Sequence, residues 1–166
     1  TALLNGIESW ALTWADLIAL RDTYGWEIGN HSQTHANLTT LSDAELAAEV
    51  VAIHDDFASH GITVNSYATP FGIYDDRVLS AIAKNHTSHR MAWGETNTWP
   101  LGTNDYQIRV FEPKTGVTLE DAKAKVDAAV ANGEWLVLLF HDVTATGTVG
   151  HVHEEDVYAW PIDLFT

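Results

Sequence analysis

Two histidines four residues apart, His31 and His35, form the clearest chemical pattern in this sequence. Residues at this spacing share one face of a helical turn, so both imidazoles can bind one metal ion at about 2.0–2.1 Å. Alone, the pair is only suggestive, because polar surface helices often contain two histidines. The strand-like run just before it, residues 26–29, favours a site at the end of a strand. We therefore predict a metal site at His31 and His35.

Two further strand ends carry residues suited to a catalytic site. His141 follows the apolar run 135–140, and the turn Pro70-Phe71-Gly72 follows the run 62–67. In parallel α/β proteins, active sites gather at the carboxyl ends of the strands. We expect His141 and this turn to lie at the same edge of the sheet as the histidine pair.

The elements that must position these residues alternate between helices and strands. Thr13 and Ser42 are capping residues followed three positions later by an acid, and Gly25 and Gly61 are expected helix ends. Helices are predicted over residues 14–25, 42–61, 75–82 and 118–133. Spacing places Val126 and Val130 on the buried face of the last helix.

Strands are predicted over residues 26–29, 62–67, 90–93, 106–111 and 135–140. Strands that alternate with helices imply βαβ units and a parallel sheet with helices outside it. The fold class is therefore α/β, either a barrel or an open sheet. Residues 94–105 are the longest connection expected to lack both helix and strand, and such loops are often functional.

The composition limits the class of protein. The chain has 166 residues, with 8 Lys and Arg against 23 Asp and Glu and a net charge of −15. Such charge disfavours nucleic acid and anionic membranes as partners. There is no cysteine, so a metal must use His and carboxylate, and no apolar run is long enough to span a bilayer. We expect one domain over residues 1–166, truncated at its N-terminus because the chain opens on an apolar stretch without Met.

Four segments of the sequence resemble motifs of one enzyme family, the polysaccharide deacetylases of the NodB-homology type, or carbohydrate esterase family four. Residues 27–38, Glu-Ile-Gly-Asn-His-Ser-Gln-Thr-His-Ala-Asn-Leu, resemble its metal motif. Ala68-Thr69-Pro70-Phe71-Gly72 resembles its Arg-x-Pro-Tyr-Gly motif without the Arg. Residues 135–141 resemble its last strand and catalytic His, and residues 106–110 its Arg-bearing strand. The resemblance covers nearly the whole chain.

The resemblance implies a fold and a reaction. The fold would be a distorted (β/α)7-type barrel that lacks its first strand. The reaction would be removal of N-acetyl groups from a polysaccharide of N-acetylglucosamine type, such as peptidoglycan, a chitin-like polymer or poly-N-acetylglucosamine. A divalent metal, most often Zn²⁺, would be held by His31, His35 and a carboxylate. The Phe71 backbone N–H would stabilise the oxyanion, and His141 would donate a proton to the leaving amine.

Four residues are candidates for contact with the sugar. Pro70 lies in the resembling motif, and the indoles of Trp93 and Trp99 could stack on sugar rings. Arg109 could brace a carboxylate or a substrate group, or it could form a structural salt bridge. The other tryptophans named by pattern, Trp10, Trp14 and Trp135, fit core or cap positions.

One motif of the family is missing. Its Thr-Phe-Asp-Asp-Gly segment supplies a metal-binding Asp and the catalytic base, and nothing in this chain matches it. Residues 1–6 resemble the second strand, so we expect the acid pair upstream of Thr1. Otherwise the chain is a carbohydrate-binding or receptor-binding module that has lost catalysis, on a cell surface or a phage tail, or another His-carboxylate hydrolase. For the enzyme we expect an extracellular or cell-surface location.

The remaining histidines receive weaker predictions. His54 and His60 are six apart on a helix, so we expect surface or cap roles rather than a shared metal. His86 and His89 should lie near a helix end, where a cation suits the dipole. His151 and His153 have the types of ligands but are expected in a loop. Asp142 could orient an imidazole or cap a loop.

Overall fold

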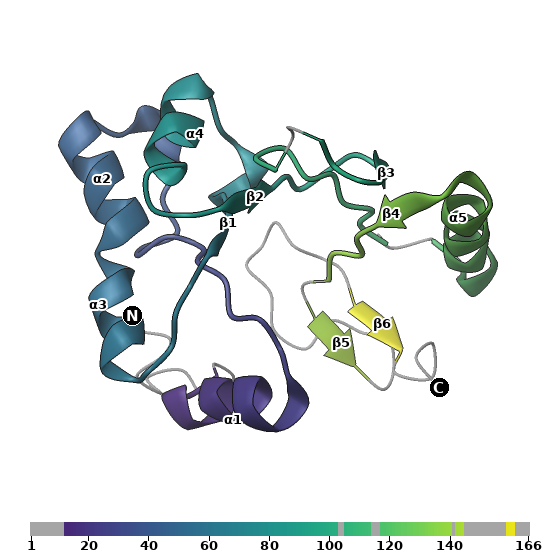
Figure 1. Ribbon diagram of the computed structural model, residues 1–166, viewed down its shortest axis with the longest axis horizontal. Coiled ribbons are helices and arrows are strands. Elements are labelled where there is room, and N and C mark those ends of the chain that lie inside the picture. Colours follow the sequence, from purple (N-terminus) through teal and green to yellow (C-terminus); the bar gives the residue numbers. More distant parts are fainter. Residues whose placement is uncertain (1–11, 103–104, 114–116, 141, 145–158, 162–166) are drawn as a thin grey trace. The chain divides into compact units, whose positions relative to one another are not determined.

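The computed structural model describes residues 12–102, 105–113, 117–140, 142–144 and 159–161 (Figure 1). The chain divides into two compact units. The first unit comprises residues 1–91 and 104–108, and the second comprises residues 92–103 and 109–166. Each unit is described by itself below. A compact unit need not fold independently, so the single domain over residues 1–166 remains a prediction.

The helices of the first unit begin at the caps that the sequence predicts. Helix α1 spans Trp14–Tyr24, and the Thr13 hydroxyl and the Asp16 carboxylate form its capping box. Gly25 ends α1 with a φ of 72°, a left-handed angle that glycine adopts without strain. Ser42 and Glu45 form the corresponding box of α2, which spans Asp43–Val51. Asp75 caps α4, which spans Asp76–Ile82.

The segment expected as one helix over residues 42–61 consists of two. Helix α2 ends at Val51, and α3 spans Ile53–Ser59. Ala52 between them keeps helical angles, with φ −58° and ψ −31°, so the interruption is local. The apolar residues predicted to share one face are all buried: Leu46, Val50, Ile53 and Phe57.

The strands of the first unit are short and pair in parallel, in chain order. Strand β1 spans Ser66–Ala68 and pairs with β2, Ser88–Arg90. Single bridges add Asn30 beside Tyr67 and Ile108 beside Arg90, both parallel. The first two of these parallel connections carry helices, α2 with α3 and then α4, as the predicted βαβ units require, whereas the described residues between β2 and Ile108 form no helix. The mixed α/β class is confirmed, whereas these few short strands do not confirm a barrel.

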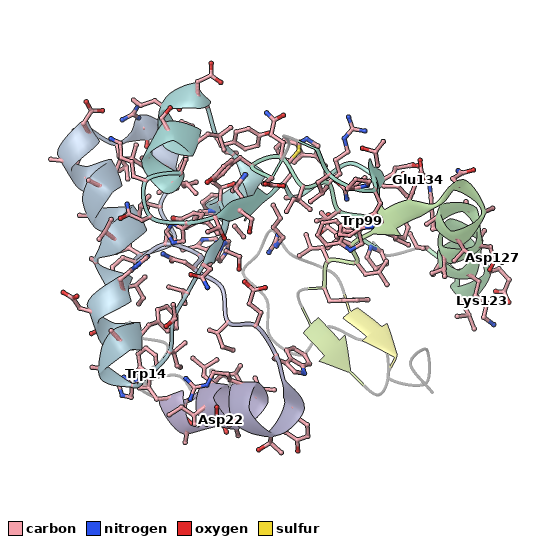
Figure 2. All side chains as sticks on the ribbon, in the orientation of Figure 1. Trp14, Asp22, Trp99, Lys123, Asp127 and Glu134 are labelled. Atoms are coloured by element: carbon pink, nitrogen blue, oxygen red, sulfur yellow. The ribbon has the colours of Figure 1, made fainter. Side chains whose placement is uncertain are left out.

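Two apolar clusters hold the first unit together. One joins α2 and α4 to β1 through Leu46, Val50, Val78, Ile82 and Tyr67, and these two helices lie side by side in Figure 1. The other joins α1 to α3 through Leu17, Ile53 and Phe57. Trp14 also packs on Phe57, so its predicted core or cap position is confirmed (Figure 2).

The second unit contains an antiparallel pair that the sequence analysis did not predict. Strand β3, Thr96–Thr98, lies within the connection expected to lack strands and pairs antiparallel with β4, Glu134–Leu136. Phe111 and Leu138 form a parallel bridge, and β5, Asp142–Thr144, pairs in parallel with β6, Ala159–Pro161. The parallel arrangement is thus only partial in this unit.

Helix α5, Leu119–Asn132, begins at the predicted Thr118 cap but turns a different face inward. Val126 and Val130 are 44% and 76% exposed, whereas Ala129 is buried. The prediction that Val126 and Val130 face the interior is therefore wrong, because the buried side of α5 within this unit carries Ala129. None of the helices in the described ranges is long and apolar enough to cross a membrane.

Candidate metal centre

The rings of His31 and His35 lie next to each other in the first unit. Their centroids are 4.9 Å apart and the ring planes meet at 71°. The backbone between them is not the expected helical turn. Ser32 and His35 have φ angles of 71° and 63°, in the left-handed region that non-glycine residues rarely adopt. A folded loop, not helical periodicity, therefore brings the two imidazoles together.

The orientation of His31 leaves one ring nitrogen suited to a metal. Its Nδ1 lies 2.8 Å from the carbonyl oxygen of Ala68, at the end of β1. A carbonyl can only accept a hydrogen bond, so Nδ1 carries the proton and Nε2 of the neutral ring keeps its lone pair. Donation from the second nitrogen to a carbonyl is the usual support of a metal-binding histidine. His31 therefore fits the predicted ligand role.

Asn30 anchors the chain immediately before His31. It is 2% exposed, and its backbone bonds both ways to β1, from N to Ser66 O and from Ala68 N to its O, each at 2.9 Å. Its side chain donates to Val50 O at 2.9 Å and accepts from Ser32 N at 3.0 Å. The position from which His31 leaves the sheet is therefore fixed by backbone and side chain together.

Glu49 of α2 holds the middle of the same loop. Its carboxylate accepts hydrogen bonds from Gln33 N at 3.0 Å, Thr34 N at 2.9 Å and the Thr34 hydroxyl at 2.7 Å. A carboxylate that accepts several N–H and O–H groups is a strong local anchor. The backbone N–H of His35 is bonded to Ser32 Oγ at 3.0 Å. The loop from Asn30 to His35 is thus built by its own residues and by α2.

Neither Asn30 nor Glu49 is a predicted site residue. Asn30 had a detectable signal, since it is a polar residue directly before His31 at a predicted strand end. The sequence around Glu49 carries no such signal. Its partners lie 15 and 16 residues earlier in the chain, and in the helical pattern Glu49 takes a position where acids usually face solvent. Only the folded structure shows that this acid supports the histidine loop.

Phe71 lies beside the histidine pair. Its ring meets the His35 ring edge to face, with centroids 4.7 Å apart. The backbone of Phe71 has a φ of 58°, inside the short helix η2, Pro70–Gly72. No acceptor for the Phe71 N–H is found among the described residues. This N–H therefore suits the predicted oxyanion role. Pro70, by contrast, is fully buried and fixes the turn rather than offering surface to a sugar.

The donor set is incomplete within the described residues. Two imidazoles fit a divalent metal such as Zn²⁺, which typically takes three protein ligands in catalytic sites. Across the described ranges, no group of three or more His, Cys, Asp or Glu side chains could hold a metal ion. The described residues therefore offer two of the ligands that such a site would need, the imidazoles of His31 and His35.

The remaining predicted site residues belong to the second unit or fall outside the described residues. Trp93 and Trp99 are 50% and 65% exposed, and Trp99 meets Trp135 edge to face at 5.8 Å (Figure 2). Arg109 has its backbone clamped by the Asn97 amide at 2.8 and 2.9 Å. Its guanidinium forms no ion pair with a described residue. His141 lies outside the described residues.

The prediction that His86 lies near a helix end is correct, since its backbone N–H donates to Ile82 O at the end of α4, but the expected cation is wrong for both His86 and His89. His86 is 3% exposed, and His89, on β2, is fully buried. Burial lowers the pKa of His86 from 6.5 to about 4 and also lowers that of His89. Both rings are therefore neutral at pH 7.

His54 and His60, both expected in surface or cap roles, have different contacts in the structure. His60 stacks on Trp14 at 4.1 Å, and its Nδ1 donates to Asp56 O at the end of α3. His54 instead contacts His86, with 3.0 Å between the two Nε2 atoms. His151, His153 and the side chain of Asp142 are outside the described structure.

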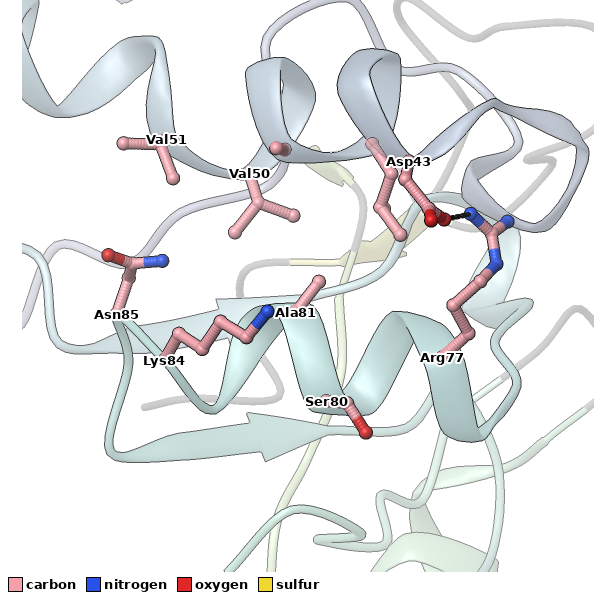
Figure 3. A pocket seen from close by; sticks show the side chains of 10 residues that line it. Asp43, Val50, Val51, Arg77, Ser80, Ala81, Lys84 and Asn85 are labelled. Atoms are coloured by element: carbon pink, nitrogen blue, oxygen red, sulfur yellow. Dashed lines mark hydrogen bonds and ion pairs between the residues drawn. The ribbon is translucent and has the colours of Figure 1, made fainter.

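A cavity of about 390 Å³ opens between α2 and α4 (Figure 3). Its polar lining includes Arg77, whose guanidinium pairs with Asp43 at 2.9 Å, and Lys84. Neither His31, His35 nor Phe71 lines it. This cavity is therefore separate from the candidate metal centre.

Comparison with known proteins gives one family. The family model described as polysaccharide deacetylase matches residues 4–89, which is just over half of the chain. No curated protein matches significantly. Among solved structures, a polysaccharide deacetylase from Bacillus cereus has 16% sequence identity and a TM-score of 0.64, covering 75% of this chain and 40% of that one. The Streptococcus pyogenes deacetylase PplD, solved with acetate, has 19% identity and a TM-score of 0.59, covering 74% and 54%.

These likenesses show a shared fold. The chain spans only 40% and 54% of the two solved chains. The matched family region contains Asn30, the two histidines and Phe71, and it ends at His89. The candidate metal centre therefore lies in the part of the chain that carries the family signal.

Proposed function

This chain belongs to the polysaccharide deacetylase family, and we propose that it forms most of the metal site of an amide hydrolase acting on a polysaccharide of N-acetylglucosamine type. The observation that carries the proposal is the placement of His31, His35 and Phe71. Two imidazoles and a backbone N–H with no acceptor among the described residues lie together at the end of parallel strands. Metal ligands and an oxyanion donor are among the parts that hydrolysis of an N-acetyl group requires.

Each residue has a separate task in the proposed reaction. His31, through Nε2, and His35 would hold the divalent metal, which we propose to be Zn²⁺. When bound, such an ion lowers the pKa of a water ligand and polarises the acetyl carbonyl. The Phe71 N–H would donate to the acetyl oxygen as negative charge develops there, a contact worth roughly 3 kcal/mol. His141 would give a proton to the leaving amine, which otherwise departs slowly.

The third ligand and the catalytic base belong to the proposal and not to the described structure. The family's Asp-Asp motif has no match in the chain, and we propose that an upstream segment of the same polypeptide supplies it. The polysaccharide would be contacted by Trp93, Trp99 and Arg109 of the second unit. An enzyme of this kind, acting on a cell-wall or exported polymer, would work outside the cell or at its surface.

A second candidate is a carbohydrate-binding module without catalysis. It is favoured by the absence, within the described ranges, of a carboxylate that completes the histidine pair. Such a module would keep the aromatic sugar contacts while releasing no product.

Acetate release separates the two candidates. The polypeptide with its upstream segment is incubated with N-acetylglucosamine oligomers, with added Zn²⁺ or with a chelator. The proposed enzyme releases acetate only with the metal. Glycan binding without any metal-dependent acetate release would reject the enzyme and support the binding module.

A further inference from the structure

A chain of one half-buried and one buried hydrogen bond connects α3 to Asn30, the residue that precedes the proposed metal ligand His31. His54 Nε2 lies 3.0 Å from His86 Nε2, which in turn lies 3.2 Å from Asn30 Nδ2. Asn30 and His86 are 2% and 3% exposed, so water cannot readily replace these contacts. Nothing in the proposed reaction uses His54 or His86.

The protons in this chain can be assigned from the partners. His86 Nδ1 faces the carbonyl oxygen of Ile82 at 3.3 Å, so Nδ1 carries the proton of the neutral ring. His86 Nε2 is then an acceptor, and both Asn30 Nδ2 and His54 Nε2 donate to it. Burial lowers the pKa of His86 to about 4 and keeps this lone pair available at neutral pH.

The same contact fixes the orientation of the Asn30 amide. The two Nδ2 hydrogens go to Val50 O and His86 Nε2, while Oδ1 accepts from Ser32 N. Rotating the amide by half a turn would place Oδ1 against two acceptors and Nδ2 against a donor. Three partners therefore allow one orientation, and that orientation holds Ser32 in its left-handed conformation beside His31.

We propose that His86 is a positioning residue for the metal centre, which sets the Asn30 amide and through it the loop that presents His31 and His35. The effect of His86 on catalysis rests on the proposed function. The hydrogen bonds from Asn30 and His54 to His86, which we call the brace, do not depend on that function. His54 supports the brace by donating to the same nitrogen. Neither histidine touches the metal.

His86 Nε2 and Val50 O are the two acceptors that the described residues give to the Asn30 amide nitrogen. The Tyr67 ring packs against His86 with centroids 4.9 Å apart. A lost acceptor at His86 would leave a buried amide hydrogen unpaired, at a cost of about 1–3 kcal/mol. The loop can avoid that cost only by leaving its present conformation.

Two polar replacements of His86 provide the sharpest test. The side-chain amide of His86→Gln can reach the position of Nε2 and accept from Asn30, whereas that of His86→Asn reaches only the position of Nδ1. Both remove the imidazole and place an amide in the same buried site. Asn is one methylene smaller than Gln, so hydrogen exchange in α4 reports the difference in packing, and exchange of the loop relative to α4 reports the acceptor.

The measurements are Zn²⁺ affinity and hydrogen exchange of residues 31–35, made on the polypeptide with its upstream segment. We expect His86→Asn to weaken Zn²⁺ binding by about 10–100-fold and to speed exchange in the loop relative to α4, with His86→Gln close to wild type. His60→Gln is the control, because His60 does not contact Asn30. Equal Zn²⁺ affinity and equal loop exchange in the two His86 variants would overturn the inference.

This outcome is distinguishable from failure of the proposed function. If the wild type binds Zn²⁺ but releases no acetate, the affinity comparison still tests the brace. If the wild type binds no Zn²⁺, faster loop exchange in His86→Asn alone supports the brace, and unchanged exchange rejects it.

Discussion

His31 Nδ1 donates a hydrogen bond to the carbonyl oxygen of Ala68 at 2.8 Å, and this contact ties the first metal-motif histidine to the end of β1. Ala68 also donates its N–H to Asn30 O at 2.9 Å. The strand segment before His31 and the strand before Phe71 are therefore joined at the point where both motifs begin. The two motifs form one structural unit.

Glu49 should be required for an ordered metal loop. Replacing it with alanine removes the carboxylate that accepts from Gln33 N, Thr34 N and the Thr34 hydroxyl, and leaves Gln33 N only the Glu49 backbone carbonyl at 3.2 Å. We expect Glu49→Ala to weaken Zn²⁺ binding by about tenfold or more, measured by metal competition. Asp43→Ala on the same helix is the control, since its surface ion pair with Arg77 contributes about 0–1 kcal/mol. Equal affinities in the two variants would show that Glu49 does not order the loop.

Stability should fall as the pH drops from 6.5 towards 4. The folded-state pKa of His86 is lowered from 6.5 to about 4, first by burial and further by the neighbouring His54. Between these values the unfolded chain binds a proton that the folded chain does not, so the stabilisation present above pH 6.5 is lost on acidification. Its size is at most about 3 kcal/mol.

This pH dependence is measured by urea unfolding of the wild type and His86→Gln at several pH values. The wild type should lose more stability over that interval than the variant. Parallel curves for the two proteins would mean that His86 is not buried as a neutral ring.

Trp99 should contribute to glycan binding without affecting the metal. Its indole is 65% exposed and held edge-on by Trp135, so it offers an open face to a sugar ring. We expect Trp99→Ala to weaken binding of N-acetylglucosamine oligomers several-fold in calorimetry while Zn²⁺ affinity stays constant. Trp26→Ala is the matched control, because Trp26 is similarly exposed at 61% and is not among the proposed sugar contacts. Equal loss in both variants would remove Trp99 from the sugar contacts.

The sequence predicted the features that depend on local chemistry. Capping at Thr13, Ser42 and Thr118 follows from hydroxyl and acid spacing, and all three boxes are present. The adjacency of His31 and His35 was also correct, although the expected helical turn was not. Ser32 and His35 have left-handed angles instead, in a loop held by Asn30 at Ser32 N and by Glu49, 15 residues later, at Thr34 N.

What could not be predicted depends on distant partners. Nothing in the residues that flank His86 in the sequence indicates that it is buried. Its burial depends on contacts with Tyr67, His54 and Asn30, which are distant in the sequence, and burial keeps its ring neutral. Strand β3 likewise forms by pairing with a distant strand, β4. Its residue Asn97 pairs with Trp135, which lies 38 residues later in the chain. Val126 and Val130 were misplaced because periodicity does not say which helix face a sheet will cover.

His141 should act on the proton of the leaving amine and not on the metal. Replacing it with alanine is expected to lower kcat for acetate release by about 10²–10⁴ with little change in Zn²⁺ content, because general acid catalysis contributes about that much. The Zn²⁺ content is measured on the same purified protein. Loss of the metal in His141→Ala would make this residue a ligand instead.

The most direct test of the account measures Zn²⁺ content and acetate release together, in the polypeptide with its upstream segment. The wild type should bind one Zn²⁺ and release acetate from N-acetylglucosamine oligomers. His31→Ala and His35→Ala should each lose most of both, since two ligand nitrogens are proposed to hold the ion, while His60→Ala keeps both. Unchanged Zn²⁺ in the His31 and His35 variants, or acetate release that survives in them, would contradict the metal centre proposed here.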